Sequence, residues 1–251
     1  MAGLISALGL DRPGLVSLVG SGGKTSLLWA LAAELAAAGQ PVAVTTTTHI
    51  HPPLARQAAG LWLWGAEIPD PAELRPRLLA PGPLCLAASR QATGKLRGLS
   101  PAQIAALLAL PGLWLLCEAD GAAGRPLKAW DQHEPALTGR EAAIVVLVGG
   151  SGLGRPLRPE VVHRPQIMAQ ALDLAPGQPI PPPALAAYLA GPAGPLRNAS
   201  PNAAKTLVLG QGDQTSPTQR RAFLQAAAQT RQFQRLLWGS PATGRLEAWW
   251  E

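Results

Sequence analysis

Short apolar runs alternate along the chain with longer stretches of helical spacing. The first run, residues 15–19, ends at Gly20, and the leucines that recur every fourth position after it predict a helix from Lys24 to Gly39. A second apolar run follows at residues 41–44. Strand, loop, helix and strand together take about thirty residues, the length of a βαβ unit, and such units are nearly always parallel and right-handed.

The same alternation continues to the end of the chain. Strands are predicted at residues 61–64, 84–87, 113–117, 144–148 and 206–209, and helices at 101–110, 164–172, 183–189 and 217–229. This order predicts an α/β fold with an open, mostly parallel sheet and helices on both faces, as a single domain over residues 1–251. Residues 175–200 are rich in Pro, Gly and Ala and predict either a small helical insertion or a loose connection.

The turn after the first strand has the composition of a phosphate-binding loop, Gly20-Ser21-Gly22-Gly23-Lys24-Thr25-Ser26. Its glycines let main-chain N–H groups turn inward, and the helix N-terminus adds a positive dipole. Lys24 would reach the terminal phosphates of ATP or GTP, and the Thr25 hydroxyl would bind Mg²⁺. Leu18 replaces the first glycine of the common eight-residue loop, so the turn resembles the shorter loop of the Mur ligases. A plain glycine-rich turn with a solvated lysine is the alternative.

Two carboxylates follow the apolar strand at residues 113–117, namely Glu118 and Asp120. In an open parallel sheet the ligand crevice lies beyond the carboxyl ends of the strands, so these side chains are expected to meet a metal held by the phosphate loop. One would bind Mg²⁺ together with Thr25 while the other polarises water or substrate. Lys24, Glu118 and Asp120 are therefore the predicted catalytic residues. Alternatively, both carboxylates form the turn or pair with Arg125.

Charge and composition narrow the ligands and the location. The net charge of +6 comes mostly from scattered Arg residues, which favours anionic small molecules over nucleic acid. Only two cysteines occur, both in apolar runs, which indicates a reducing compartment. Residues 1–10 lack the features of a signal peptide, and no apolar stretch reaches the roughly 18 residues of a membrane helix. A cytoplasmic protein without membrane contact is expected.

Four segments together resemble the YqeC family, described as accessory proteins of selenium-dependent molybdenum hydroxylases: residues 19–26, the threonines 45–48, residues 118–128 and residues 162–165. The likeness spans roughly residues 14–230. It implies a P-loop NTPase-like nucleotide-binding protein that acts in maturation of a selenium- and molybdenum-containing cofactor. The implied partners are a molybdopterin-type cofactor or selenium donor and a molybdenum hydroxylase.

Polar side chains after several strands are candidates for binding an acceptor. They are Thr46, Thr47, Arg125, Lys128, His163 and Arg164. Solvated basic loops, β-propensity of the threonines and structural histidines are the alternatives. His49 and His51 would point the same way on an extended chain and contact substrate or metal, although the ligands of a dedicated transition-metal site are missing.

Two functions are compatible with these motifs. The first is a Mg²⁺-dependent nucleoside triphosphate-binding accessory protein that hydrolyses the nucleotide or transfers its phosphoryl group. The second is a non-catalytic cofactor carrier or insertion chaperone that nucleotide occupancy switches.

Overall fold

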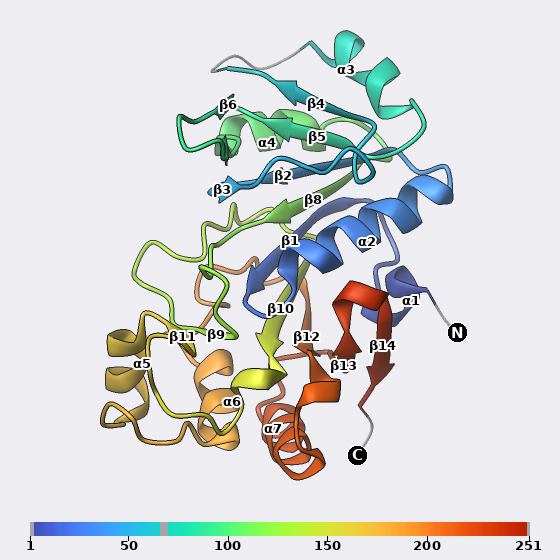
Figure 1. Cartoon of the computed structure of the whole chain (residues 1–251). Helices are drawn as coiled ribbons and strands as arrows, with labels where there is room; N and C mark the ends of the chain where they lie inside the picture. Colours follow the sequence, from blue (N-terminus) through green and yellow to red (C-terminus); the bar gives the residue numbers. More distant parts are fainter. Residues whose placement is uncertain (1–2, 66–69, 250–251) are drawn as a thin grey trace.

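A computed structural model describes residues 3–65 and 70–249, apart from the side chains of Pro71, Ala72 and Asp213 (Figure 1). Its centre is a nine-stranded sheet in the order β14-β13-β12-β10-β1-β8-β2-β5-β4. All neighbouring strands are parallel except β13 and β14. The predicted α/β class with a large, mostly parallel sheet is confirmed and is consistent with a P-loop NTPase-like fold.

The strands of this sheet are β1 (Gly14–Gly20), β2 (Val42–Thr46), β4 (Gly60–Leu63), β5 (Leu84–Ala87), β8 (Trp114–Glu118), β10 (Ala143–Gly149), β12 (Ala204–Gly210), β13 (Arg235–Ser240) and β14 (Arg245–Ala248). The helices are α1 (Leu4–Leu8), α2 (Lys24–Ala37), α3 (Pro71–Leu78), α4 (Pro101–Leu108), α5 (Pro165–Leu172), α6 (Pro182–Ala190) and α7 (Pro217–Gln229). Two small sheets pair β9 (Leu127–Lys128) with β11 (Val162–His163) and join β3 (His49–Ile50), β7 (Leu96–Arg97) and β6 (Ser89–Arg90).

Alternation along the buried strands divides the core between the two faces of the sheet. Val16 and Leu18 of β1 pack with α1 and α2 on one face. Leu15 and Val19 point to the opposite face, where α3 and α4 cover one half of the sheet and α5, α6 and α7 cover the other. Helices therefore lie on both faces, as a parallel sheet requires when its strands are apolar throughout.

All seven predicted strands and all five predicted helices are present, with bounds that differ by two residues at most. Residues 175–200 contain a helix, α6, whose Leu185 and Leu189 share a core with Phe223 of α7. Of the two alternatives for residues 175–200, the helical one is therefore correct. Elements that the pattern did not predict include α1, α3, β13 and β14.

The topology gathers the loops that follow the central strands at one edge of the sheet. β1 lies between β8 and β10, so Gly20, Glu118 and Gly149 end side by side. Both small sheets stand beyond these strand ends (Figure 1). Within the described residues, none of the helices has the length and apolarity needed to cross a membrane.

Candidate functional site

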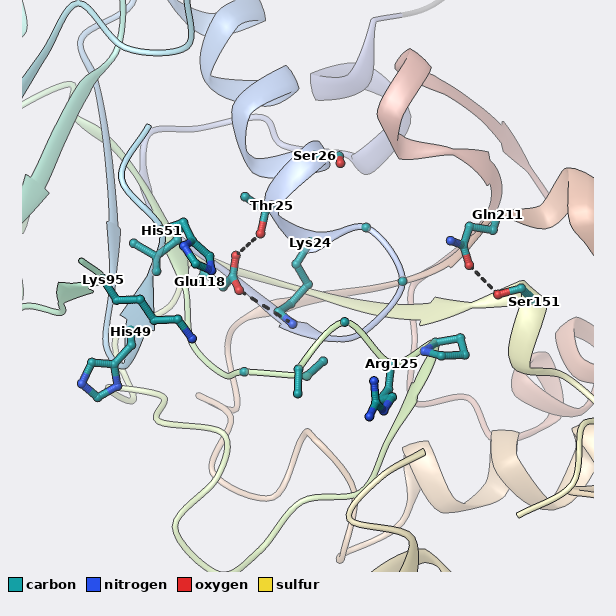
Figure 2. Close-up of a pocket in the computed structure, with 18 residues that line it drawn as sticks. Lys24, Thr25, Ser26, His49, His51, Lys95, Glu118, Arg125, Ser151 and Gln211 are labelled. Atoms are coloured by element: carbon teal, nitrogen blue, oxygen red, sulfur yellow. Dashed lines mark hydrogen bonds and ion pairs between the residues drawn. The ribbon is translucent and has the colours of Figure 1, made fainter. Parts of the chain in front are cut away.

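A cavity of about 670 Å³ opens beyond the carboxyl ends of the central strands (Figure 2). Its lining comes from the loop after β1 (residues 22–26), Glu118 and the segment 121–126. Residues 49–51 and Lys95 of the three-stranded sheet complete one wall, while Ser151 and Gln211 lie at the other end. The volume falls within the range of about 300–1,000 Å³ that is usual for small-molecule sites.

The loop after β1 is fixed in its first half and open in its second. The N–H of Gly20 donates to both carboxylate oxygens of Asp120, and the N–H of Ser21 donates to Leu147 O at 2.9 Å. The Ser21 hydroxyl also donates to Pro126 O at 2.6 Å. In contrast, no acceptor in the described part of the chain pairs with the N–H groups of residues 22–26. Such free amides at a helix N-terminus are suited to bind an anion.

Gly22 allows the loop to pass close to β10. Its φ of +77° lies in the left-handed region, and an added Cβ would collide with the backbone of Gly149. Gly39, with φ +70°, has nothing within 4 Å of its Cβ position, so it has the same backbone conformation without the collision.

We expect Gly22→Ala to lower the free energy of unfolding by more than about 2 kcal/mol, because left-handed strain adds to a backbone collision. Gly39→Ala should cost only the strain, about 1 kcal/mol. Urea unfolding of both variants measures the difference. Equal losses would show that the approach of the loop to Gly149 is not a tight constraint.

Thr25 and Glu118 form a hydroxyl–carboxylate pair at the cavity. Thr25 Oγ1 donates to Glu118 Oε2 at 2.8 Å, and Lys24 Nζ lies 3.9 Å from Glu118 Oε1 (Figure 2). Burial raises the pKa of Glu118, while Lys24 and the bond from Thr25 oppose the shift. Hydroxyl and carboxylate oxygens are ligands that Mg²⁺ prefers. The residues present therefore fit a magnesium ion, and Thr25 and Glu118 would hold it.

Within the described residues, this pair is not part of a larger metal-binding cluster. Among residues 3–65 and 70–249, no group of three or more His, Cys, Asp or Glu side chains could hold a metal ion. A magnesium ion held by Thr25 and Glu118 would also bind phosphate oxygens and water, as Mg²⁺ commonly does in nucleotide sites.

Asp120 lies behind the loop and is fully buried. Besides the Gly20 N–H, it accepts a hydrogen bond from Trp130 Nε1 at 2.6 Å. Lys24 Nζ lies 3.2 Å from one of its oxygens and Lys128 Nζ lies 3.4 Å from the other. The cavity lining does not include Asp120. This geometry makes Asp120 a positioning residue for the loop and for Lys24, whose Nζ also donates to Gly20 O at 2.5 Å.

A chain of ion pairs continues from Asp120 toward α5. Lys128, also fully buried, pairs with Glu134 Oε2 at 2.7 Å, and Glu134 pairs in turn with Arg164. Arg164 also contacts Asp131 Oδ2 at 2.9 Å. Lys128 and Arg164 are therefore engaged in ion pairs, and neither residue lines the cavity.

The remaining acceptor candidates occupy different places. Arg125 lines the cavity, and its Nε donates to Pro159 O at 2.6 Å. His163 pairs with Lys128 in the small parallel sheet, away from the lining; burial, followed by Lys128 and Arg164, lowers its pKa. Acceptor binding by His163 stays a prediction.

The threonine run connects two strand ends. Thr46 Oγ1 donates to Glu118 O at 2.6 Å, and the N–H of Thr47 donates to the same oxygen at 3.3 Å. Neither threonine lines the cavity. Both hold the main chain of Glu118, which fixes the carboxylate from behind.

Sequence reasoning did not assign Lys95, Ser151 or Gln211 to the site, although all three line the cavity. Lys95 had a weak signal, because it directly precedes the apolar Leu96, which is buried at the start of β7. Ser151 and Gln211 follow the predicted strands at 144–148 and 206–209, and strand ends at this edge are where a crevice forms.

The sequence was compared with protein families, curated proteins and solved structures. The sequence model described as "YqeC protein" matches residues 16–166, which include the glycine-rich loop after β1 and the segment from Glu118 to Lys128. The chain belongs to the YqeC family. The YqeC protein of Escherichia coli (strain K12) is 37% identical over 201 residues, covering 77% of this chain and 76% of that protein. No solved structure matches the chain.

Proposed function

We propose that this YqeC-family chain binds a nucleoside triphosphate with Mg²⁺ and hydrolyses it or transfers its terminal phosphoryl group. The observation that carries the proposal is the run of free N–H groups at residues 22–26, which begins α2 and faces a cavity large enough for a small molecule. Backbone donors and the helix dipole at one point favour a polyphosphate.

The side chains around the loop match the needs of phosphoryl chemistry, which depends mainly on positioning and charge stabilisation. Lys24 is a cation in the cavity lining, and its ion pair with Asp120 holds it beneath the loop. When bound, Mg²⁺ neutralises charge on the terminal phosphate oxygens. Glu118 orients Thr25 through their hydrogen bond.

The two ends of the cavity suit different parts of the nucleotide. Thr25 and Glu118 mark the end where a metal and the terminal phosphate belong (Figure 2). At the other end, the Ser151 hydroxyl donates to Gln211 Oε1 at 2.7 Å, and we assign the nucleoside to this polar pair. An amide and a hydroxyl can satisfy either purine, so the proposal covers both ATP and GTP. Asp213 lies two residues after Gln211, and its side chain is outside the described part of the structure.

Membership of the YqeC family supports a proposal for the cellular role. We place the chain, as a cytoplasmic accessory protein, in maturation of a selenium- and molybdenum-containing hydroxylase cofactor, with a molybdopterin-type cofactor or selenium donor as the acceptor. An accessory enzyme of this kind needs a nucleotide site and a separate acceptor site, and we place both in the cavity of about 670 Å³.

The proposal is tested by magnesium-dependent binding of the non-hydrolysable analogue AMP-PNP, measured by titration calorimetry. We expect Mg²⁺ to strengthen binding in the natural chain and to have little effect in Glu118→Gln. The Mg²⁺ concentration required should fall as pH rises through the raised pKa of Glu118, since a proton and Mg²⁺ compete for the carboxylate. Exposed Glu160 provides a matched control, Glu160→Gln.

Release of phosphate from ATP or GTP then decides between the two functions. Turnover supports an enzyme, whereas binding without release, alone and with a molybdopterin-type acceptor, supports a nucleotide-switched carrier. If the natural chain bound no analogue of ATP or GTP, both the enzyme and the carrier would be rejected.

A further inference from the structure

The three-stranded sheet of β3, β7 and β6 has one face in the core and one face at the cavity. Ile50 is 5% exposed and Leu96 is fully buried, and both belong to the core that packs around α2. Because side chains alternate along a strand, the neighbours of these two residues point away from the core. These neighbours include His49, His51 and Lys95, which are all exposed and all line the cavity.

Strand pairing brings the three side chains together. In the antiparallel register His49 lies opposite Arg97 and Ile50 lies opposite Leu96. Continuing this register by one residue places His51 opposite Lys95, and directly opposite side chains on one face are neighbours. Figure 2 shows Lys95 between the two imidazoles, on the side of the cavity where Thr25 and Glu118 lie.

The hairpin that carries Lys95 is held in place. Gln91 N–H donates to Lys95 O at 2.8 Å, which closes the turn between β6 and β7. The Gln91 side chain lies 2.9 Å from His49 Nε2 and so ties this turn to β3. In the wall formed by His49, His51 and Lys95, the turn that carries Lys95 is therefore held against His49.

Charge indicates what this wall binds. Lys95 has no carboxylate partner among the described residues, and neither has Arg125 across the cavity. Glu118 is the carboxylate in the lining, and its hydrogen bond to Thr25 engages it. The free N–H groups of residues 22–26 and Lys24 are already assigned to binding the polyphosphate. The remaining cations are left for a second anionic group.

We propose that His49, His51 and Lys95 bind the anionic group, carboxylate or phosphate, of a second small-molecule substrate beside the terminal phosphate of the nucleotide. The proposal rests on the nucleotide site proposed above, because Thr25 and Glu118 define which end of the cavity faces the terminal phosphate. Lys95 supplies the charge, and the imidazoles supply hydrogen bonds in directions fixed by the sheet.

Inorganic phosphate serves as the probe, with the nucleotide site filled by AMP-PNP and Mg²⁺ so that the loop is not available to it. Equilibrium dialysis with radiolabelled phosphate should detect a single bound phosphate per chain. Lys95→Gln should weaken this binding at least about tenfold, the size expected for one charge-assisted hydrogen bond. Added acetate should displace the phosphate if the wall accepts carboxylates and should leave it bound if the wall selects phosphate.

Lys205→Gln is the matched control, since it removes the same charge from β12, outside the cavity lining and away from His49, His51 and Lys95. Its phosphate affinity should stay within about twofold of the natural chain. Phosphate binding that is absent up to about 10 mM, or that Lys95→Gln does not change, would overturn the proposal. The AMP-PNP titration separates the two hypotheses. If the natural chain does not bind AMP-PNP, the proposed function is contradicted. Dialysis with phosphate alone then tests the wall, through the effect of Lys95→Gln on phosphate binding.

Discussion

Lys24→Ala is expected to weaken binding of AMP-PNP by about 10- to 100-fold. Lys24 is the buried cation at the start of α2, and its amine lies among Gly20 O, Asp120 and Glu118 at the base of the loop. A hydrogen bond to a charged group contributes about 1.5–3 kcal/mol, which corresponds to this loss. Titration calorimetry gives the affinity directly.

A thermal-shift measurement provides an independent check on the same variant. A ligand at 100 times its Kd stabilises the folded state by about 2.7 kcal/mol, so AMP-PNP should raise the Tm of the natural chain and raise that of Lys24→Ala much less at the same concentration. Lys205→Ala, on β12 and outside the cavity lining, is the control. Unchanged affinity in Lys24→Ala would remove Lys24 from the nucleotide site.

Local sequence was sufficient to locate the glycine-rich loop between β1 and α2. The apolar strand, the glycines, Lys24 and the helical leucine repeat are contained within about thirty residues, so the signal for this unit is local. The fold class followed for the same reason, since helices separate most successive strands of the large sheet. Residues 175–200 were ambiguous because proline begins α6 while alanine fills it, and only its packing on α7 decides the conformation.

The different placements of Glu118 and Asp120 could not be predicted from sequence. Strand alternation puts residues two apart on the same side, but β8 ends at Glu118, so alternation no longer governs Asp120. Its partners Lys24 and Lys128 come from two other segments. The positions of Lys128 and Arg164 could not be predicted either, because their ion pairs with Glu134 join residues that only the fold brings together.

β13 and β14 illustrate a further limit of sequence patterns. β13 begins with exposed Arg235 and ends in partly buried residues, and the residues of β14 are mostly exposed. β14 is the edge strand and β13 lies next to it, and both bury few side chains, so their apolar periodicity is weak. Pairing with β12 on one side and with β14 on the other fixes β13 in the sheet.

Asp120→Asn is expected to lower the free energy of unfolding by about 3–5 kcal/mol, the usual cost of removing one partner from a buried ion pair. The substitution would leave Lys24 and Lys128 near each other without the carboxylate that lies between them at 3.2 and 3.4 Å. It would also leave a single amide oxygen to serve donors that now reach two carboxylate oxygens. Urea unfolding measures the loss, and Asp173→Asn, at an exposed residue with φ +52°, is a control that should change stability little.

A double variant tests the electrostatic origin of this loss. If uncompensated charge is the cause, adding Lys128→Met to Asp120→Asn should cost less than the sum of the two single changes, because the methionine removes one of the two cations that lose Asp120 as a partner while Glu134 keeps Arg164. Additive losses would instead indicate that Asp120 acts mainly through its hydrogen bonds to Gly20 and Trp130. In that case Asp120 shapes the loop without setting the position of Lys24, and Asp120→Asn should then weaken AMP-PNP binding only as far as the loop itself is displaced.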